Sequence, residues 1–295
     1  MPLSDPLLGT ACVKPMQTNL DHRVVKGFGE EWACFDQQSL SGRERQNIFD
    51  QYFGIFPWST LPVNAVGFDL GCGSGRWARV VGPRVGMLHC IDASDAALNV
   101  AKQNLRELPN CTFHHASVDA IPLDDNSMDF GYSLGVLHHI PDTAAGIRSC
   151  VKKLKSRSPL LLYLYYAFDN RPLWFRVIWR GTDLLRRAIS SAPFFIRYPL
   201  SQAVAGFVYW PLARLSMLLE YFGVNVESIP LSWYRGLSFY TMRTDALDRF
   251  GTRLEQRFTS TQIVRMMEEA GLERITFSNS MPFWCAIGYK KPCAG

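Results

Sequence analysis

Residues 67–77 read GFDLGCGSGRW, an apolar run with one carboxylate that leads into three glycines at alternate positions. The apolar run predicts a short strand, and Gly71, Gly73 and Gly75 remove three Cβ atoms from the turn after it. A backbone without side chains turns sharply and lets a ligand lie against it, while the next helix offers free N–H groups at its start. The stretch therefore predicts a strand, a ligand-binding turn and a helix.

The chain beyond this turn alternates between strand and helix patterns. The run at 159–166, PLLLYLYY, is continuously apolar, as expected for a central strand covered on both faces. Regular alternation predicts an α/β sheet with right-handed crossovers. The other expected strands are 65–70, 87–92, 111–117, 128–134, 272–278 and 283–290, and the expected helices are 76–81, 94–108, 143–155 and 260–270.

The alternation stops at residues 167–258, which are rich in Trp, Phe, Tyr, Arg and Pro and carry helical patterns. It resumes at Thr259, where Thr259 and Gln262 have the spacing of a capping box. We therefore expect three parts. Residues 1–64 form an N-terminal helical lid segment, residues 65–166 and 259–295 form the ligand-binding domain, and residues 167–258 form a helical substrate-cap insertion.

Composition narrows the class of protein. A chain of 295 residues with 47% hydrophobic and 19% charged residues is an ordered globular protein, and a net charge of +5 is too mild to indicate nucleic-acid binding. The N-terminus lacks the pattern of a signal peptide, and the apolar run 203–213 is too short to span a bilayer. We expect a cytoplasmic protein without a metal site, because no C-x-x-C pair occurs among Cys12, Cys34, Cys72, Cys90, Cys111, Cys150, Cys285 and Cys293.

Three carboxylates at strand ends indicate which ligand the turn holds. A dinucleotide fingerprint has glycine where this chain has Arg76, and the Gly-Lys-Ser/Thr of a P-loop is absent. In an open α/β sheet, ligands bind at the carboxyl ends of the strands. There Asp69 suits an ammonium group, Asp92 suits ribose hydroxyls and Asp119 suits the adenine amine, although each acid alone would also serve as a cap or turn residue. S-adenosylmethionine carries these three groups and no phosphate, and we expect it as the cofactor.

The series GFDLGCGSG, CIDAS and ASVDAIPLDDNSMDFGYSLGVLHHIPD resembles the class I S-adenosylmethionine-dependent methyltransferases, notably the ubiquinone and menaquinone C-methyltransferases and their relatives. The resemblance covers residues 65–166 and, more loosely, 259–289. It implies a Rossmann-like seven-stranded sheet of order 3-2-1-4-5-7-6 with the last strand antiparallel. It also implies a cofactor site in which the methionine part meets Asp69, Gly71, Cys72, Gly73, Gly75, Ser133 and Leu134, the ribose meets Asp92 and Ala93, and the adenine meets Val118, Asp119 and Ala120.

The segment KGFGEEW at 26–32 is similar to one that precedes this domain in some relatives, where aromatic side chains of an N-terminal helix fold over the cofactor. Phe28 and Trp32 lie four residues apart and share one face if the segment is helical. A cofactor lid and ordinary core packing both remain open for these two side chains.

Methyl transfer from a sulfonium is an in-line displacement that depends mainly on positioning, and it needs a base only when the acceptor loses a proton. His138 and His139 follow the fourth strand, and packing against the cofactor is favoured over a general base for them. Tyr165 and Tyr166 end the expected fifth strand, so that one of the two should face the site. Arg243, in the insertion, is a further candidate for acceptor binding and catalysis.

The insertion is the part left to determine which acceptor binds. Residues 171–220 contain seven arginines and no lysine, with Asp183 and Glu220 as the acids. Three interpretations remain open, namely a cap with solvated arginines, capture of a hydrophobic or anionic substrate, and weak peripheral contact with a membrane. We expect a small-molecule acceptor. The alternatives are a non-catalytic S-adenosylmethionine-binding protein and an RNA or protein methyltransferase; the segment SLGVLHHIPD after the fourth strand lacks the N-P-P-Y-type tetrad of relatives that methylate amino groups of nucleic acids.

Overall fold

The protein is described from a computed structural model, which covers residues 18–169, 171–282 and 284–292. Its centre is a seven-stranded sheet of order β3-β2-β1-β4-β5-β7-β6. β1 to β5 are parallel, and β7 is antiparallel to both β5 and β6. The expected sheet order is confirmed. The strands are β1 (Val66–Leu70), β2 (Met87–Asp92), β3 (Cys111–His115), β4 (Phe130–Leu134), β5 (Pro159–Tyr163), β6 (Leu272–Phe277) and β7 (Cys285–Lys290).

Helices cover the sheet on both faces, which explains the continuous apolar run of β5. Leu161 packs in one hydrophobic cluster, whereas its neighbours Leu160 and Leu162 pack in another, and none of the three is exposed. The first cluster also contains residues of α2 (Gly42–Phe53), α3 (Ala78–Val81) and α4 (Asp95–Asn104). The second contains residues of α5 (Thr143–Lys153) and α10 (Ser260–Glu269).

Local signals set where several elements begin and end. The side chain of Thr259 accepts the N–H of Gln262 and the side chain of Gln262 accepts the N–H of Thr259, so the capping box predicted for α10 is confirmed. β5 was expected to continue to Tyr166 but ends at Tyr163. The chain leaves the sheet there, and Tyr166 instead forms an isolated bridge with Phe258.

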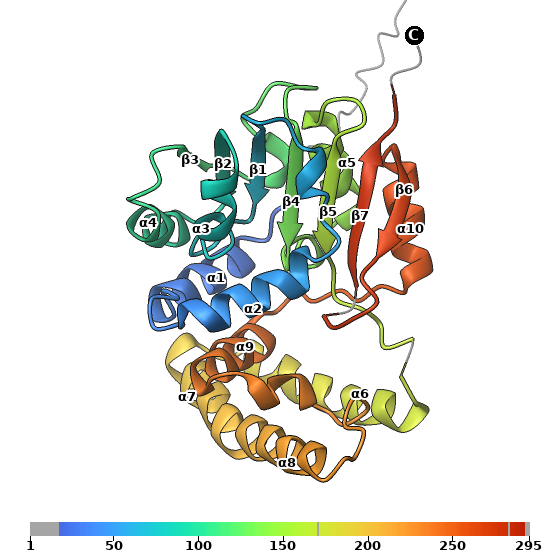
Figure 1. The fold of residues 1–295 in the computed structure, drawn as a ribbon. Helices are drawn as coiled ribbons and strands as arrows, with labels where there is room; N and C mark the ends of the chain where they lie inside the picture. Colours follow the sequence, from blue (N-terminus) through green and yellow to red (C-terminus); the bar gives the residue numbers. More distant parts are fainter. Residues whose placement is uncertain (1–17, 170, 283, 293–295) are drawn as a thin grey trace, which may run out of the picture.

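The insertion lies beyond the carboxyl ends of the parallel strands, and the N-terminal helices α1 (His22–Cys34) and α2 lie between it and the sheet (Figure 1). Its helices are α6 (Leu173–Ser190), α7 (Phe194–Val204), the π-helical segment η5 (Ala205–Tyr209), α8 (Trp210–Tyr221) and α9 (Phe239–Gly251). No helix in the described part of the chain has both the length and the hydrophobicity needed to cross a bilayer. The described cysteines are free thiols, while Cys12 and Cys293 lie outside the described residues.

Candidate active site

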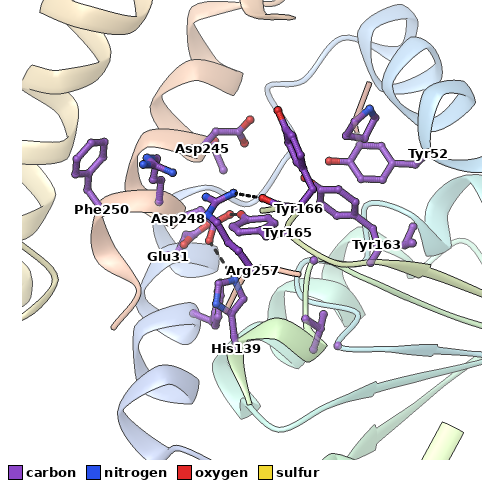
Figure 2. A pocket seen from close by; sticks show the side chains of 18 of the residues that line it. Glu31, Tyr52, His139, Tyr163, Tyr165, Tyr166, Asp245, Asp248, Phe250 and Arg257 are labelled. Carbon is purple, nitrogen blue, oxygen red and sulfur yellow. Dashed lines mark hydrogen bonds and ion pairs between the residues drawn. The ribbon is translucent and has the colours of Figure 1, made fainter. Parts of the chain in front are cut away.

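A cavity of about 490 Å³ lies where the carboxyl ends of the strands face α1 and the insertion. Residues that follow β1, β2, β4 and β5 form one wall, which we call the cofactor wall. Residues of α6, η5, α8 and α9 form the opposite wall, which we call the insertion wall, and residues of α1 also line the cavity. Figure 2 shows how tyrosines, carboxylates and His139 meet inside this cavity.

The glycine turn after β1 has a backbone that other residues do not readily adopt. Gly71, Gly73 and Gly75 have φ angles of +76°, +55° and +76°. A Cβ atom on Gly71 would lie 2.3 Å from the Cγ2 atom of Val136, and one on Gly73 would lie 2.8 Å from the Nε1 atom of Trp32. The turn therefore packs tightly on its neighbours, and its bare backbone at Gly71 faces the cavity.

Asp92 at the end of β2 lines the cavity together with Ala93 and is held by backbone groups. Its Oδ2 atom accepts the N–H of Gly73 at 2.9 Å, and its Oδ1 atom accepts the N–H of Ser94 at 2.8 Å. A carboxylate accepts about four hydrogen bonds, so acceptor positions remain for ribose hydroxyls. The tight glycine cradle and this carboxylate fit the nucleoside and methionine parts of S-adenosylmethionine.

Asp69 lies beneath the glycine turn and does not line the cavity. Burial raises the pKa of this carboxyl to about 8. Ser133, also expected at the methionine end, is buried and donates its hydroxyl to the carbonyl oxygen of Leu70 at 3.0 Å. The expected contact of Asp69 with an ammonium group therefore stays a prediction.

Asp119 also lies outside the cavity wall, in the 3-10 turn Val118–Ala120. The backbone N–H of Asn19 donates to its Oδ2 atom at 2.5 Å, and the side chain of Asn19 bonds the backbone of Asp142. The segment before α1 thus occupies the carboxylate expected to bind adenine, a contact that the sequence did not indicate. Val118 lines the cavity whereas Ala120 does not, and the adenine contacts of this turn stay a prediction.

Phe28 and Trp32 both project from α1 into the cavity. The ring of Phe28 lies 5.1 Å from that of His139, and Trp32 lies against Gly73 in the glycine turn. Both side chains therefore sit where a lid over the cofactor would sit, and the lid interpretation stays a prediction. In sum, the cavity is lined by Gly71, Cys72, Asp92, Ala93, Val118, Leu134, Phe28, Trp32, His139 and Tyr166 among the expected site residues, and not by Asp69, Gly73, Gly75, Asp119, Ala120, Ser133, His138 or Arg243.

The two adjacent histidines have different surroundings. His138 is fully buried and stacks on Tyr165, with ring centroids 3.8 Å apart, and burial lowers its pKa well below the ordinary value. It does not line the cavity, and a catalytic role for it stays a prediction. His139 does line the cavity, and its Nδ1 atom lies 2.7 Å from the carbonyl oxygen of Leu254, which assigns the proton to Nδ1 and leaves Nε2 as the acceptor.

Three carboxyl groups, which the sequence did not bring together, line the cavity with His139. Asp248 of α9 has its Oδ1 atom 4.0 Å from His139 Nε2, and its Oδ2 atom accepts the hydroxyl of Tyr165 at 2.7 Å. Burial raises the pKa of Asp245 to about 6, and burial together with Asp248 and Asp245 raises that of Glu31 well above the ordinary range. Asp245 and Asp248 share a helix face three residues apart, a signal that was available, whereas nothing in the sequence marks Glu31.

Two side-chain placements on the acceptor side differ from the expected ones. Arg243 lies between α7 and α9, where its Nε atom donates to Gln202 at 2.6 Å and its Nη2 atom donates to Tyr198 at 3.1 Å. It therefore donates to two neutral side chains and does not line the cavity, and a catalytic role for Arg243 stays a prediction. Tyr165 and Tyr166 both line the cavity instead of facing opposite ways, because β5 ends at Tyr163 and the alternation of an extended strand stops there.

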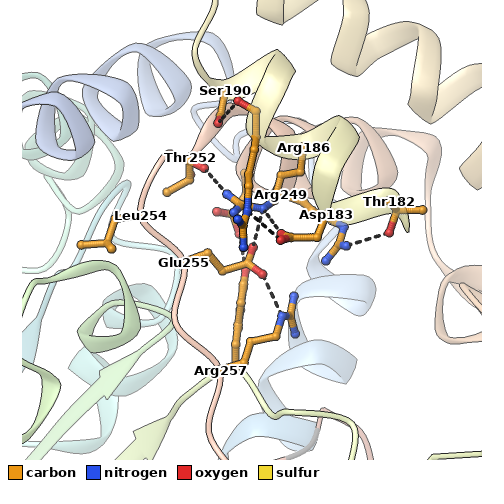
Figure 3. A network of polar contacts seen from close by, with 12 residues as sticks. Thr182, Asp183, Arg186, Ser190, Arg249, Thr252, Leu254, Glu255 and Arg257 are labelled. Carbon is orange, nitrogen blue, oxygen red and sulfur yellow. Dashed lines mark hydrogen bonds and ion pairs between the residues drawn. The ribbon is translucent and has the colours of Figure 1, made fainter. Parts of the chain in front are cut away.

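Buried polar contacts attach the insertion wall to the segment that returns to the sheet (Figure 3). Arg186 of α6 donates to Asp183 at 2.7 Å and to the carbonyl oxygen of Thr252 at 2.7 Å. Arg257 donates to Glu255 at 2.7 Å, and Glu255 lies 4.0 Å from Arg186. Removing one partner from such a buried pair leaves an uncompensated charge, so this network keeps α6 in a defined position over the cavity.

Parts of the chain are similar in sequence to known proteins. Residues 68–162 match the family described as methyltransferase domain. A ubiquinone biosynthesis O-methyltransferase from Nitrosomonas europaea is 32% identical over 197 residues, which are 61% of this chain and 80% of that protein. Phosphoethanolamine N-methyltransferase 2 from Caenorhabditis elegans is 33% identical over 125 residues, 41% of this chain, and the chain spans only 27% of that relative's length. Among solved structures, the N-methyltransferase NodS from Bradyrhizobium japonicum in complex with S-adenosyl-L-homocysteine is 17% identical, covering 48% of this chain and 72% of that chain with a TM-score of 0.40.

The sheet order and the glycine turn define a Rossmann-like methyltransferase domain. With identity of 32% over most of the Nitrosomonas enzyme, the chain belongs to the class I S-adenosylmethionine-dependent methyltransferases. It is an enzyme of this class, and its cofactor is S-adenosylmethionine.

Proposed function

We propose that the protein methylates a hydroxyl group of a small, largely apolar acceptor bound between the cofactor wall and the insertion wall. The observation that carries this proposal is a pair of buried acceptor atoms, His139 Nε2 and Asp248 Oδ1. They lie 4.0 Å apart, and neither has a hydrogen-bond donor among the described residues. Buried polar atoms are normally paired, so this spot suits a ligand that brings its own donor. A hydroxyl group does so.

His139 has the properties of a base for that hydroxyl. Burial lowers its pKa, so its ring is neutral at neutral pH and Nε2 has a free electron pair. The charge of Asp248 acts in the opposite direction and favours the protonated ring. As the hydroxyl oxygen gains its methyl group, its proton passes to Nε2, and Asp248 stabilises the resulting imidazolium.

The remaining lining supports an apolar acceptor. The insertion wall includes Phe175, Trp179, Leu212 and Phe250, which offer contact area but few hydrogen bonds. Arg249 lies in the same wall and suits an anionic group on the acceptor. The relative from Nitrosomonas europaea, by its name an O-methyltransferase of ubiquinone biosynthesis, supports oxygen as the atom that is methylated.

The cofactor wall provides the other half of the site. The turn at Gly71 and Cys72 would hold the methionine part, and Asp92 would accept hydrogen bonds from the ribose. When bound, S-adenosylmethionine supplies an electrophilic methyl group on its sulfonium. Phe28 and Trp32 would exclude water from that methyl group. Water would otherwise compete with the hydroxyl of the acceptor for the position next to the methyl group.

Turnover with a panel of apolar phenols, followed by formation of S-adenosylhomocysteine, tests this proposal. We expect His139→Gln to lower kcat by roughly a hundredfold, because general-base catalysis contributes about that much or more. The kcat of the wild type should fall below about pH 6.5, the ordinary pKa of histidine, or at a lower pH because burial lowers the pKa of His139. The kcat of the variant should not fall with pH in this way. His22→Gln, at the exposed start of α1, is the matched control and should behave as the wild type. Methylation of amines but of no phenol, or normal turnover by His139→Gln, would show that the proposal is wrong.

A further inference from the structure

The outer face of the insertion is apolar. Among the residues that the structure describes, all exposed large apolar side chains except Val63, Met87 and Phe239 lie within residues 173–224. We call this set of exposed apolar side chains on α6, α7, η5 and α8 the outer face. Monomeric soluble proteins rarely expose large contiguous apolar patches, and such patches indicate binding to a protein or a membrane.

In helix α6, the exposed apolar side chains of the outer face and the buried charged side chains lie on different sides of the helix. Asp183 and Arg186 point inward and form a buried ion pair (Figure 3). Leu173, Val177 and Leu184 are exposed. With about 3.6 residues per turn, these three leucine and valine positions form one stripe along the helix. The helix therefore buries one ion pair and exposes an apolar stripe, which an ordinary surface helix would turn inward.

Positive charge accompanies the outer face without negative charge to match it. Arg176 and Arg180 of α6 are exposed, and no described acidic residue forms an ion pair with either. Within residues 171–222 the only acids are Asp183 and Glu220, and both are already engaged, Asp183 by Arg186 and Arg187 and Glu220 by Arg235.

The cavity opens on this face. Ile178 of α6 and Val208 of η5 line the cavity, and they are also 52% and 43% exposed. A side chain that is both part of the lining and in contact with solvent marks the mouth of a cavity. The mouth therefore lies between α6 and η5, with apolar side chains on both sides of it.

We propose that the outer face docks on an anionic lipid bilayer and that the acceptor enters the cavity from the bilayer between α6 and η5. The entry step rests on the proposed function, whereas docking does not. Acyl chains would cover the apolar side chains, and lipid phosphates would supply the negative charge that Arg176 and Arg180 lack. Trp174, Trp210 and Tyr221 are of the residue types that gather at membrane interfaces.

A lipid surface fits the outer face better than a second copy of the chain. A symmetric dimer through this face would bring the same two arginines of each copy into one interface. Asp183 and Glu220 already form ion pairs within each copy. The arginines of the two copies would therefore repel each other without carboxylates to compensate their charge.

Vesicle flotation tests the docking, with vesicles of phosphatidylcholine alone and of phosphatidylcholine mixed with phosphatidylglycerol. We expect the protein to partition at least about tenfold more strongly onto the anionic vesicles at low salt, and to lose this preference at high salt. Phe207→Ser combined with Phe222→Ser, at positions 84% and 71% exposed, should lower partitioning by about tenfold or more. Arg176→Gln combined with Arg180→Gln should abolish the preference for anionic vesicles.

The matched control is Val63→Ser, which is 94% exposed and lies before β1, at the end of the sheet away from the insertion. It should partition as the wild type does, and calorimetry with S-adenosylhomocysteine should show that every variant still binds the cofactor product. Three results would overturn docking: no partitioning of the wild type, partitioning that the outer-face variants do not change, or light scattering that shows a dimer which Phe207→Ser/Phe222→Ser dissociates.

Vesicle binding is measured without an acceptor, so its failure leaves methyl transfer in place. If the wild type binds vesicles and yet methylates no phenol, docking stands and the proposed acceptor is wrong. Entry from the bilayer requires in addition that an acceptor dissolved in anionic vesicles is methylated faster by the wild type than by Phe207→Ser/Phe222→Ser, while both use a water-soluble phenol equally well.

Discussion

The cofactor wall and the insertion wall face each other across one cavity and are built by different means. The cofactor wall presents backbone at Gly71, and its main carboxylate, Asp92, is held by two backbone N–H groups. The insertion wall presents side chains, with aromatic rings and the carboxyl groups of Asp245 and Asp248. A ligand site made of backbone depends on the conformation of the turn, so a substitution that changes this site also disrupts the turn. A site made of side chains can change its ligand through single substitutions that leave the backbone in place. Cofactor and acceptor binding should therefore respond separately to substitution.

The largest effect on the cofactor side is expected from Asp92→Ala. The variant loses acceptors for the ribose hydroxyls and also the tether to Gly73, so binding of S-adenosylhomocysteine should weaken by about 1–3 kcal/mol. Titration calorimetry measures this directly. Unchanged affinity, or tighter binding of NAD than of S-adenosylhomocysteine by the wild type, would contradict the assignment of the cofactor wall.

Tyr166→Ala should separate the two walls. We expect kcat on a phenolic acceptor to fall by more than about tenfold, or about 1.4 kcal/mol, because the side chain of Tyr166 lines the cavity where the proposed acceptor would bind. Cofactor affinity should change by less than about threefold, since the backbone of the glycine turn is untouched. Arg243→Gln is the comparison variant, and it should retain normal turnover because its partners Gln202 and Tyr198 lie away from the cavity. Parallel loss of cofactor and acceptor binding in Tyr166→Ala would mean that the walls do not act separately.

Asp69 should make the stability of the cofactor-free protein depend on pH. Its folded-state pKa of about 8 lies above the usual unfolded value, so the folded state holds an extra proton between these values. Its contribution to the free energy of unfolding is complete below the unfolded pKa and is lost as pH rises toward the folded one, with a slope of up to about 1.4 kcal/mol per pH unit. Urea unfolding of Asp69→Asn should lack this loss, whereas the exposed control Asp124→Asn should retain it. Equal slopes in wild type and Asp69→Asn would rule out the raised pKa.

The smallest effect is expected from removing metal ions. Among the described residues, no group of three His, Cys, Asp or Glu side chains is placed to hold a metal ion. Turnover after treatment with EDTA should therefore stay within about twofold of the untreated enzyme, because positioning and a base suffice for the transfer. Restoration of lost activity by one particular divalent ion would reveal a site that the structure does not show.

Much of the cofactor wall was predictable from local sequence. The strand before Gly71, the capping box at Thr259 and the alternation of strands and helices are patterns within short stretches, and each was found where expected or within a few residues. The partners of the carboxylates were less predictable. Asp119 accepts a hydrogen bond from the backbone of Asn19, and Arg243 donates to Gln202 and Tyr198. Both contacts come from segments that are distant in the sequence.

The sequence by itself determined the sheet, its order through the family resemblance, the glycine turn and the amphipathic pattern of α6. Only the tertiary structure brought Asp248 of α9 beside His139 and Glu31 of α1 near Asp245 and Asp248, because packing between remote helices sets these placements and burial raises the pKa of Glu31. Helical periodicity likewise identified two faces of α6 but not which one points inward. Packing against the returning segment places Asp183 and Arg186 inside, because Arg186 donates there to the carbonyl oxygen of Thr252. The apolar stripe stays exposed on the other side of the helix.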